Sequence, residues 1–577
     1  MPASAQGTGP VRETVVVTAS VSPEAFESVT RTLTVIDRDD IERLGIGSVI
    51  EALRLLPGLD VRARGPWEVQ SDLAIRGATF AQSLVLVDGF RINDSQSAHH
   101  NGEIPLAVAG IARIELLSGA GSAVHGADAL GGAVNVITRT DPHATATATF
   151  GQHGYAGAQA SVGGGHGLPA GWVLTGWGQR SAGFMFDREF ATGGLATRGP
   201  VGRGLVVDVR HQRRSFGANG FYGASPSFEW TDQTMAAADW TGTAGAWTTS
   251  VRGQYRNHGD HFRWDINRPG FAENRHRTDA AEVAVQARRG LTGGGRLAMG
   301  FSAGGDTVDS NALGDHRYGR VSGFAESRWA VGNRGTVQAG LRLDDYSTFG
   351  HAWSPSVSAG AWLTPDLRVR ASAARAFRIP TYTELYYRDP AHLARPDLRP
   401  ERGWSLDGGL DWSRDGWLAS VSPYRRWDED VIDWVKARPS DLWRTTNVRD
   451  VSTTGVELSL VRRWHDGLVR AFFSGQSVDA PELTLLSKYV LEYTKRSVGV
   501  SVAAPIAAGV RGTLTVDHRD KHDGQSYALV HVRLSRTFGL VDVFADATNL
   551  LDETYTEIAG VRMPGRWVTA GVTINAR

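Results

Sequence analysis

Residues 337–344 read Val-Gln-Ala-Gly-Leu-Arg-Leu-Asp, a strict alternation of apolar and polar side chains. In a β-strand, successive side chains point to opposite faces of the sheet, so this stretch has one apolar and one polar face. The same two-residue period recurs at Leu367–Ser372, Val456–Leu460 and Val530–Ser535. Short runs of this kind, separated by Gly, Pro, Asn and Asp, dominate the chain after residue 141. The pattern predicts a long array of amphipathic strands.

The size of this array favours a closed membrane barrel over a soluble sandwich. The apolar faces of such strands pack either against a second sheet or against lipid. About 436 residues, at roughly 20 for each strand and turn, predict on the order of 22 antiparallel strands. A soluble sheet of that size normally divides into domains with visible linkers, and the sequence shows none. We therefore expect an all-β transmembrane barrel over residues 142–577, wide enough to need a plug.

Composition agrees with this expectation and excludes several classes of protein. The 577 residues are 41% hydrophobic without a run of about 18 apolar residues, so no transmembrane helix is predicted. The 69 Gly and 18 Trp suit tight turns and interfacial belts. Basic and acidic residues balance at 61 each, which gives no sign of a nucleic-acid partner. The absence of Cys excludes thiol catalysis, disulfides and Cys-bound zinc.

The part of the chain before the array mixes helix and strand signals. A helix is expected at Ser48–Leu56, because Ser48 and Glu51 form a capping box and Pro57-Gly58 ends the apolar stripe. A turn is expected at Asp88-Gly89. The expected strands are Leu73–Arg76, Ser83–Val87 and Ile111–Leu117. These signals predict an α+β domain at residues 21–141, inside the barrel lumen.

Short motifs in a fixed order run through both parts of the chain. Those of the head are Ile75-Arg76-Gly77, Leu86-Val87-Asp88-Gly89, Ile111–Glu115 running into Gly119–Gly126, and Ala129–Thr138. Those of the strand array are Ala373–Thr381, Asp397–Glu401, Asn549–Tyr555 and Met563–Arg566. In the order and spacing of these motifs, the chain resembles TonB-dependent outer-membrane receptors of the cobalamin and siderophore type. The resemblance implies a plug domain within a barrel of the bacterial outer membrane.

A β-prone segment precedes the head and reads Glu13-Thr14-Val15-Val16-Val17-Thr18-Ala19. Taken alone, it is either the first strand of the head or a detachable strand that another protein captures by β-augmentation. The resemblance identifies it as a TonB box within a flexible N-terminus at residues 1–20. It also implies a partner, the TonB energy-transducing complex of the inner membrane. Ala3-Ser4-Ala5 is similar to the end of a signal peptide, so we expect that an upstream signal is missing.

The resemblance implies energised uptake without catalysis. A scarce metal-chelate nutrient is bound at the outer face and moved across the membrane, and we expect a cobalamin-like corrinoid, with a ferric siderophore as the alternative. We expect a monomer in outer-membrane lipid, without a cofactor or a resident metal ion. A passive porin-like channel is the competing class, although it needs neither a plug nor a TonB box. We do not expect an enzyme, because the sequence lacks motifs such as His-Glu-x-x-His.

Two arginines within the head motifs, Arg76 and Arg113, are candidates for holding the plug in place. We expect them to pair with barrel carboxylates, first of all Glu384 and Glu401, because the guanidinium fork matches a carboxylate and a buried pair can act as a lock. The alternative is that both arginines only line a wet lumen.

The polar loops of the head predict a ligand site at the plug apex. Its expected residues are Trp67 for stacking and Asn93, Gln96, His99, His100 and Asn101 as donors and acceptors. The His99-His100 pair either contacts a metal chelate or only solvates the loop. His258, Asp260 and His261 have metal-ligand spacing but also fit a plain surface loop. Phe216–Tyr222 is an aromatic, Gly-rich loop that either rims the site or anchors at the membrane interface.

Overall fold

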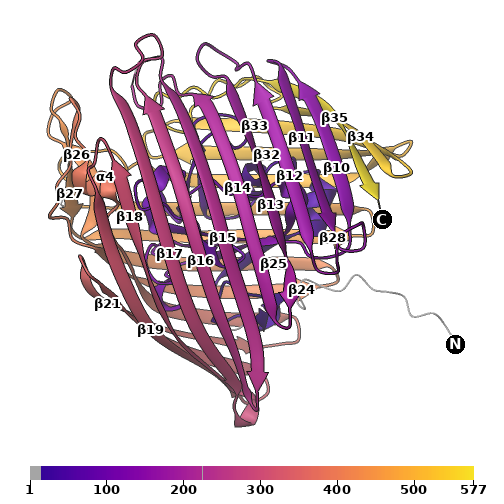
Figure 1. The fold of residues 1–577 in the computed structure, drawn as a ribbon. Coiled ribbons are helices and arrows are strands. Elements are labelled where there is room, and N and C mark those ends of the chain that lie inside the picture. The colour runs from indigo at the N-terminus through magenta and orange to yellow at the C-terminus, as the bar shows by residue number, and fades with distance from the viewer. Residues whose placement is uncertain (1–14, 22, 224, 482, 577) are drawn as a thin grey trace.

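The computed structural model describes residues 15–21, 23–223, 225–481 and 483–576. In this described part, 22 antiparallel strands form one closed barrel, in which the last strand pairs with the first (Figure 1). The expected barrel is therefore confirmed. The strands are β10 (Ala144–Gly151), β11 (Tyr155–Gly163), β12 (Val173–Ser181), β13 (Phe190–Gly202), β14 (Leu205–Gly217), β15 (Phe228–Ala244), β16 (Trp247–Arg263), β17 (Glu273–Gly290), β18 (Arg296–Ser310), β19 (His316–Val331), β20 (Gly335–Tyr346), β21 (Gly350–Trp362), β22 (Leu367–Arg378), β24 (Glu401–Arg414), β25 (Trp417–Glu429), β28 (Val451–Trp464), β29 (Gly467–Asp479), β31 (Thr494–Ala507), β32 (Val510–Lys521), β33 (Ser526–Phe538), β34 (Val541–Thr548) and β35 (Trp567–Ala576).

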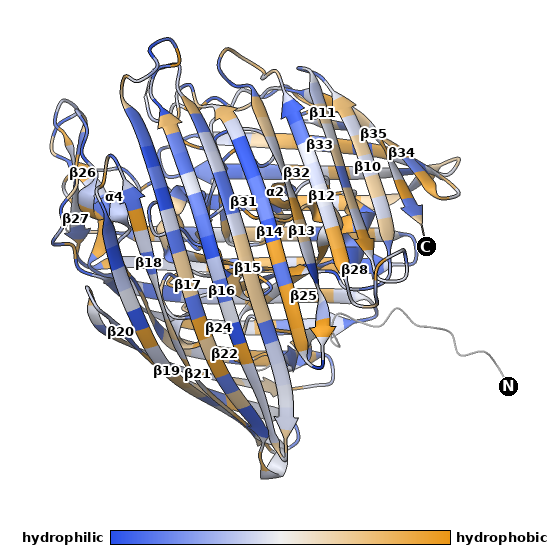
Figure 2. Ribbon diagram, viewed as in Figure 1, coloured by the Kyte–Doolittle hydropathy of each residue, from blue (hydrophilic) through white to orange (hydrophobic). Residues whose placement is uncertain are grey.

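The alternation that predicted the strands also sets which side of the wall each residue faces. In β20, Leu343 is 56% exposed on the outside, whereas its neighbours Arg342 and Asp344 are buried in the lumen. Apolar and polar residues follow one another along the strands in Figure 2. The apolar faces thus form a belt around the outside of the barrel, and the charged faces surround the plug.

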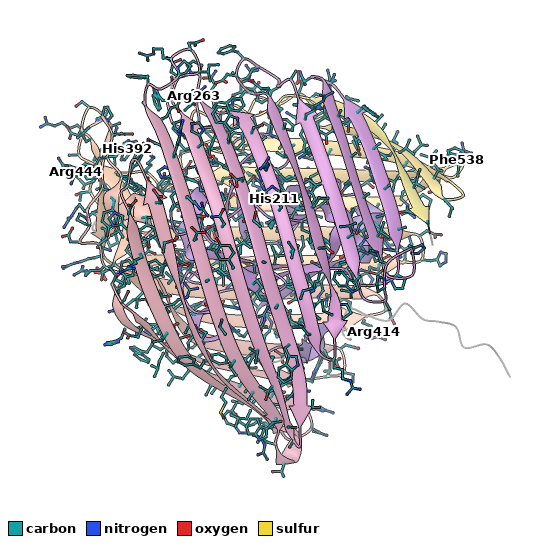
Figure 3. All side chains as sticks on the ribbon, in the orientation of Figure 1. His211, Arg263, His392, Arg414, Arg444 and Phe538 are labelled. Carbon is teal, nitrogen blue, oxygen red and sulfur yellow. The ribbon has the colours of Figure 1, made fainter. Side chains whose placement is uncertain are left out.

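The two rims of the barrel differ in the length of their connections. One rim carries long loops, such as 379–400, 430–450 and 549–566, whereas turns such as 203–204 and 245–246 close the other. Figure 3 shows His392 and Arg444 at the loop rim and Arg414 at the turn rim. Exposed tryptophans lie near both rims, as expected for interfacial girdles. They are Trp353, Trp404 and Trp427 near the loops, and Trp240, Trp329, Trp412, Trp417 and Trp464 near the turns.

The loop rim has secondary structure of its own. A small sheet of order β23-β27-β26-β30 and a short helix α4 lie within its loops. Because the longer loops of membrane barrels face the exterior, this sheet stands over the outer mouth. The elements are α4 (Tyr382–Tyr386), β23 (His392–Leu393), β26 (Val431–Lys436), β27 (Trp443–Val448) and β30 (Leu486–Ser487).

The N-terminal domain lies inside the ring of strands (Figure 1). A five-stranded sheet of order β3-β8-β9-β6-β7 forms its centre, and two further two-stranded sheets are β4-β5 and β1-β2. The strands are β1 (Val15–Val16), β2 (Glu24–Ala25), β3 (Leu33–Asp37), β4 (Leu59–Ala63), β5 (Ser71–Ile75), β6 (Ser83–Val87), β7 (Phe90–Arg91), β8 (Ile111–Ser118) and β9 (Gly132–Thr138). The helices are α1 (Arg38–Leu44), α2 (Val49–Arg54) and α3 (Ser122–His125), and 3-10 turns lie at Phe26–Ser28, Phe80–Gln82, Ala98–His100, Val108–Gly110 and, in the barrel, Thr292–Gly294.

Local sequence signals account for most of this domain. The Ser48 hydroxyl caps α2 by accepting from Glu51 N, although the Glu51 carboxylate accepts from Gly47 N and not from the cap residue itself. Asp88 and Gly89 both have positive φ, as a tight hairpin turn requires. Helix α1, which Asp37 caps, was not expected from the sequence. Within the described residues, no helix has both the length and the apolar character needed to cross a bilayer.

Candidate functional site

The N-terminal β-prone segment is docked on the plug sheet. Of the expected TonB box, Glu13 and Thr14 lie outside the described residues. Val15-Val16 forms β1, which pairs with β2. Thr18 and Ala19 are fully buried. For these positions the expectation of a flexible tail at residues 1–20 is wrong, because a specific acceptor in the plug holds the segment.

That acceptor is the buried carboxylate of Glu115 in β8. Its Oε2 accepts from Val17 N and Thr18 N, both at 3.0 Å, and from Thr18 Oγ1 at 2.6 Å. Charge-assisted hydrogen bonds are stronger than neutral ones, so one side chain anchors three donors of the segment. Arg113 Nε donates to the other oxygen, Glu115 Oε1, at 2.7 Å and fixes the carboxylate in place.

Two further plug side chains complete the dock around Thr18. Asn135 Nδ2 donates to Thr18 Oγ1 at 3.0 Å, and His125 Nε2 lies 2.9 Å from the Thr18 carbonyl oxygen. Burial lowers the pKa of His125 to about 4, so a neutral ring donates this hydrogen bond. These polar contacts join the segment to distant parts of the plug, and the buried Val16 and Ala19 add apolar packing.

Arg76 forms a deeply buried link between plug and barrel. Its guanidinium forms a bidentate pair with Glu457, with both N···O distances at 2.8 Å, and a second pair with Asp407. The Tyr424 ring lies 4.1 Å from the guanidinium carbon. Although burial alone lowers the pKa of Arg76, Glu457 and Asp407 raise it above its ordinary value. The group therefore stays charged, and its barrel partners face it from β24 and β28.

The remaining expectations about the lock are wrong in their partners. Glu384 and Glu401 both pair with Arg378 of the barrel, at 2.9 and 2.5 Å, and not with a plug arginine. Glu401 does reach the plug, because Gln82 Nε2 donates to it at 2.6 Å. Arg113 pairs inside the plug with Glu115, two residues along the same strand. Other plug–barrel ion pairs join Asp40 to Arg463 and Arg470, Arg54 to Glu557, Asp88 to Arg210, and Asp94 to Arg256.

Three of the expected apical residues have structural contacts. Trp67 stacks on Tyr155 of the barrel at a centroid distance of 4.2 Å. The Asn93 side chain is hydrogen bonded to the backbone of β6: its Oδ1 accepts from Val85 N at 2.8 Å, and its Nδ2 donates to Ser83 O at 3.1 Å. Asn101 Oδ1 accepts from Asp94 N at 3.0 Å. Asn93 and Asn101 also line a small cavity between the apex and the barrel wall.

Gln96 and the aromatic loop complete the apex. Gln96 is buried, and its Oε1 has no hydrogen-bond partner among the described residues. The expected aromatic loop starts within β14, where Phe216 is fully buried. Together with Phe221 it packs in a cluster with Trp67, so the loop is not a membrane anchor. Tyr222 of the same loop lies edge-on to His99, and the loop's role as a rim of the ligand site stays a prediction.

His99 connects the plug apex to the loop rim. Its Nδ1 lies 2.9 Å from Asp72 Oδ1, its ring stacks on Phe80, and Tyr489 OH of the outer loop lies 3.4 Å from its Nε2. Burial raises the pKa of Asp72, but Arg64 and His99 outweigh it and lower that pKa to about 2. The outer loop at 480–493 therefore touches the plug at an anionic, hydrogen-bonded point.

The His100 side chain is buried and faces the barrel wall. It is 3% exposed and lies against His258 of β16, at a ring-centroid distance of 4.6 Å. His258 and Asp260 belong to a buried strand face, so the interpretation of 258–261 as a plain surface loop is wrong. Of the three residues, only His261 lies away from this buried face; its Nε2 is 3.1 Å from Glu273 Oε2, and its ring stacks on Trp230.

Comparison with known proteins agrees with this architecture. A family model described as "TonB-dependent Receptor Plug Domain" matches residues 25–133, and "TonB dependent receptor-like, beta-barrel" matches residues 142–549. The chain belongs to the TonB-dependent receptor family. This is a family of receptors and transporters, not a class of enzymes. The stretch Gly300–Gly304 has the Gly-x-Ser-x-Gly spacing of many hydrolases, which place the serine at a strand-to-helix turn. Here the stretch lies inside strand β18, and Ser302 Oγ is hydrogen bonded to Ser322 Oγ at 2.6 Å.

Individual relatives of this TonB-dependent receptor carry two kinds of name. The "Vitamin B12 transporter BtuB" of Photobacterium profundum is 25% identical over 94% of this chain and 92% of that protein. Two solved structures share the fold: the siderophore receptor PirA from Pseudomonas aeruginosa (TM-score 0.74, 20% identity, 94% of this chain and 99% of that chain) and a mutant of the ferric enterobactin receptor PfeA from the same organism (TM-score 0.74, 16% identity, 98% and 100%).

Proposed function

We propose that this receptor takes up a cobalamin-like corrinoid across the bacterial outer membrane and that TonB drives the step. The observation that carries the energised part is the docked segment at residues 15–19. It is β-prone, and it is held by side-chain acceptors and donors. Such a segment suits capture by β-augmentation once its contacts with Glu115 are released.

A continuous set of contacts joins the apex to this segment. Asn93, next to the apical loop, holds Ser83 and Val85 of β6. β6 pairs with β9, and Asn135 of β9 accepts from Gly89 N and donates to Thr18 Oγ1. A ligand that moves the apical loop thus acts on the same strands that hold the TonB box. This adjacency supports a coupling route, which is a two-state change of the plug sheet.

The cargo part of the proposal rests on the relatives. The vitamin B12 transporter of Photobacterium profundum aligns with nearly the full length of both chains. The siderophore receptors share the fold at 20% identity or less, so they support the barrel and plug more than the cargo. A ferric siderophore remains the alternative.

Binding to the purified receptor separates the two cargoes. We expect cyanocobalamin to bind with a saturable 1:1 isotherm in calorimetry, and ferric enterobactin and a ferric hydroxamate to show no heat of binding. The Tyr489→Ala variant removes the outer-loop contact with His99 and is expected to weaken binding, whereas Trp464→Ala at the turn rim serves as the matched control. Siderophore binding without cyanocobalamin binding would identify a ferric siderophore, and not a corrinoid, as the cargo.

A further inference from the structure

Three side chains from the two domains converge beside the plug apex. His100 and Glu103 belong to the plug, and His258 belongs to β16 of the barrel. Their nitrogen and carboxylate oxygen atoms all lie within 4.8 Å of one another. His100 Nδ1 is 2.9 Å from Glu103 Oε1, and His258 Nε2 is 3.5 Å from Glu103 Oε2. All three residues are at most 3% exposed.

These separations suit a bound transition-metal ion. Around a tetrahedral Zn²⁺ with bonds of about 2.0–2.1 Å, neighbouring donor atoms lie about 3.3 Å apart. The two nitrogen–oxygen distances, 2.9 Å to Glu103 Oε1 and 3.5 Å to Glu103 Oε2, fall on either side of that value, so a small rotation of the carboxylate suffices to bring one oxygen and both nitrogens around an ion. Two imidazoles and one carboxylate are also the donor set of open zinc sites, which keep a fourth position for water or another ligand.

Each imidazole is oriented by a second carboxylate. His100 Nε2 lies 3.5 Å from Asp260 Oδ2, and His258 Nδ1 lies 3.1 Å from Asp94 Oδ2. A carboxylate on the far nitrogen fixes the tautomer and the ring orientation of a metal-binding histidine. Here it leaves His100 Nδ1 and His258 Nε2 facing Glu103, where both can present a lone pair to the same point.

One weakly satisfied atom points into this cluster. His258 Nε2 makes no hydrogen bond within the described part of the chain, and its contact with Glu103 Oε2 is 3.5 Å long, although its side chain is only 1% exposed. A buried polar atom without a hydrogen bond is unfavourable, and a cation that accepts its lone pair lowers that penalty. Around the cluster, the carboxylates of Asp94, Glu103 and Asp260 outnumber the guanidinium groups of Arg214 and Arg256. When both imidazoles are neutral, as metal binding requires, this balance is negative and favours a dication.

We propose that His100, Glu103 and His258 bind one divalent cation of the Zn²⁺ class and thereby join the plug apex to the barrel wall. The site goes beyond the uptake function and does not depend on which cargo the receptor carries. A bound ion bridges the plug loop and β16, so it stabilises the seated plug by RT ln(1 + [ion]/Kd).

Co²⁺ serves as the spectroscopic probe, because its visible absorption reports nitrogen coordination and tetrahedral geometry. The full-length purified receptor, stripped with a chelator, is titrated with Co²⁺ alone and then with Zn²⁺. We expect one equivalent to produce a tetrahedral-type spectrum that one equivalent of Zn²⁺ abolishes. We also expect saturating Zn²⁺ to raise the thermal unfolding midpoint. Neither the Co²⁺ spectrum nor the unfolding midpoint depends on transport, so a failure of cyanocobalamin uptake would not affect this test.

Matched variants locate the site. His258→Gln and Glu103→Gln each remove one ligand at nearly constant volume, and we expect each to weaken Zn²⁺ binding at least tenfold. His261→Gln, on the same strand but outside the cluster, should bind like the unchanged protein. Heat-modifiable electrophoretic mobility confirms that each barrel is folded. Absence of one-equivalent binding, or equal binding by the unchanged protein and both ligand variants, would overturn the proposal.

Discussion

The dock of residues 15–19 on Glu115 makes a quantitative prediction about Glu115→Gln. Glu115 Oε2 accepts three hydrogen bonds from the segment, and Oε1 accepts one from Arg113. Glutamine keeps a single acceptor oxygen. If that oxygen faces the segment, the new amide NH₂ group faces the guanidinium of Arg113, donor against donor.

The expected size of the effect follows from the loss of charge. A hydrogen bond to a charged group contributes about 1.5–3 kcal/mol, and a neutral one about 1 kcal/mol. Because some hydrogen bonding survives in the amide, we expect the docked state to lose about 2 kcal/mol in total. Since 1.4 kcal/mol corresponds to a factor of ten, the released population rises about 30-fold.

The absence of cysteine makes this measurable by thiol labelling. Ala19→Cys places one thiol at a position that is 1% exposed, in a chain without any other cysteine. When the segment recloses faster than a maleimide reacts, the labelling rate is proportional to the released fraction. We expect the Ala19→Cys/Glu115→Gln protein to label about 30 times faster than Ala19→Cys alone.

A surface glutamate of the same region is the control. Glu27 is exposed, so Glu27→Gln in the Ala19→Cys background should leave the rate unchanged. A folded Glu115→Gln protein that labels within a factor of two of its parent would refute the role of the carboxylate. A similar acceleration in the Glu27→Gln control would mean that the region loosens in general.

Two further predictions concern the plug. Arg76→Glu sets a third carboxylate beside Asp407 and Glu457, so we expect it to destabilise the seated plug by about 3–5 kcal/mol in urea titrations. Glu457→Arg should partly restore the stability, and unchanged stability and transport in Arg76→Glu would contradict the lock. Asp72 has a folded pKa of about 2, below its unfolded value near 3.8, so its contribution of about 2 kcal/mol is present above pH 4 and lost as the pH falls toward 2. The stability difference between the unchanged protein and Asp72→Asn should shrink over that range, and a difference independent of pH would contradict the assignment.

The sequence predicted the barrel because each strand carries its own signal. The two-residue period of residues 337–344 determines both the strand and the side that faces the lumen, without knowledge of any distant contact. The plug helix at Ser48 and the turn at Asp88 are local in the same sense. The helix α1 after Asp37 could not be predicted, because it is short and contains too few apolar residues to show a helical period.

Partners across the plug–barrel interface are not predictable from one sequence. Arg76 meets carboxylates 331 and 381 positions away, and many lumen-facing acidic residues qualify equally well. The partner of Arg113 lies two residues away, on the same face of its strand, and that spacing was a readable signal. His100 is buried because His258 and Asp260 face it, and only the register of β16 reveals that. The dock on Glu115 likewise depends on the fold of the whole plug.

Uptake of radiolabelled cyanocobalamin tests the central claim most directly. Cells that lack their own corrinoid receptor express either the intact chain or a chain without residues 13–19. Binding at the cell surface should persist in both strains, because the deletion removes none of the apical residues. We expect accumulation in the cell only with the intact chain and only while the proton-motive force is maintained. Equal accumulation by the two strains would contradict energised uptake through this segment.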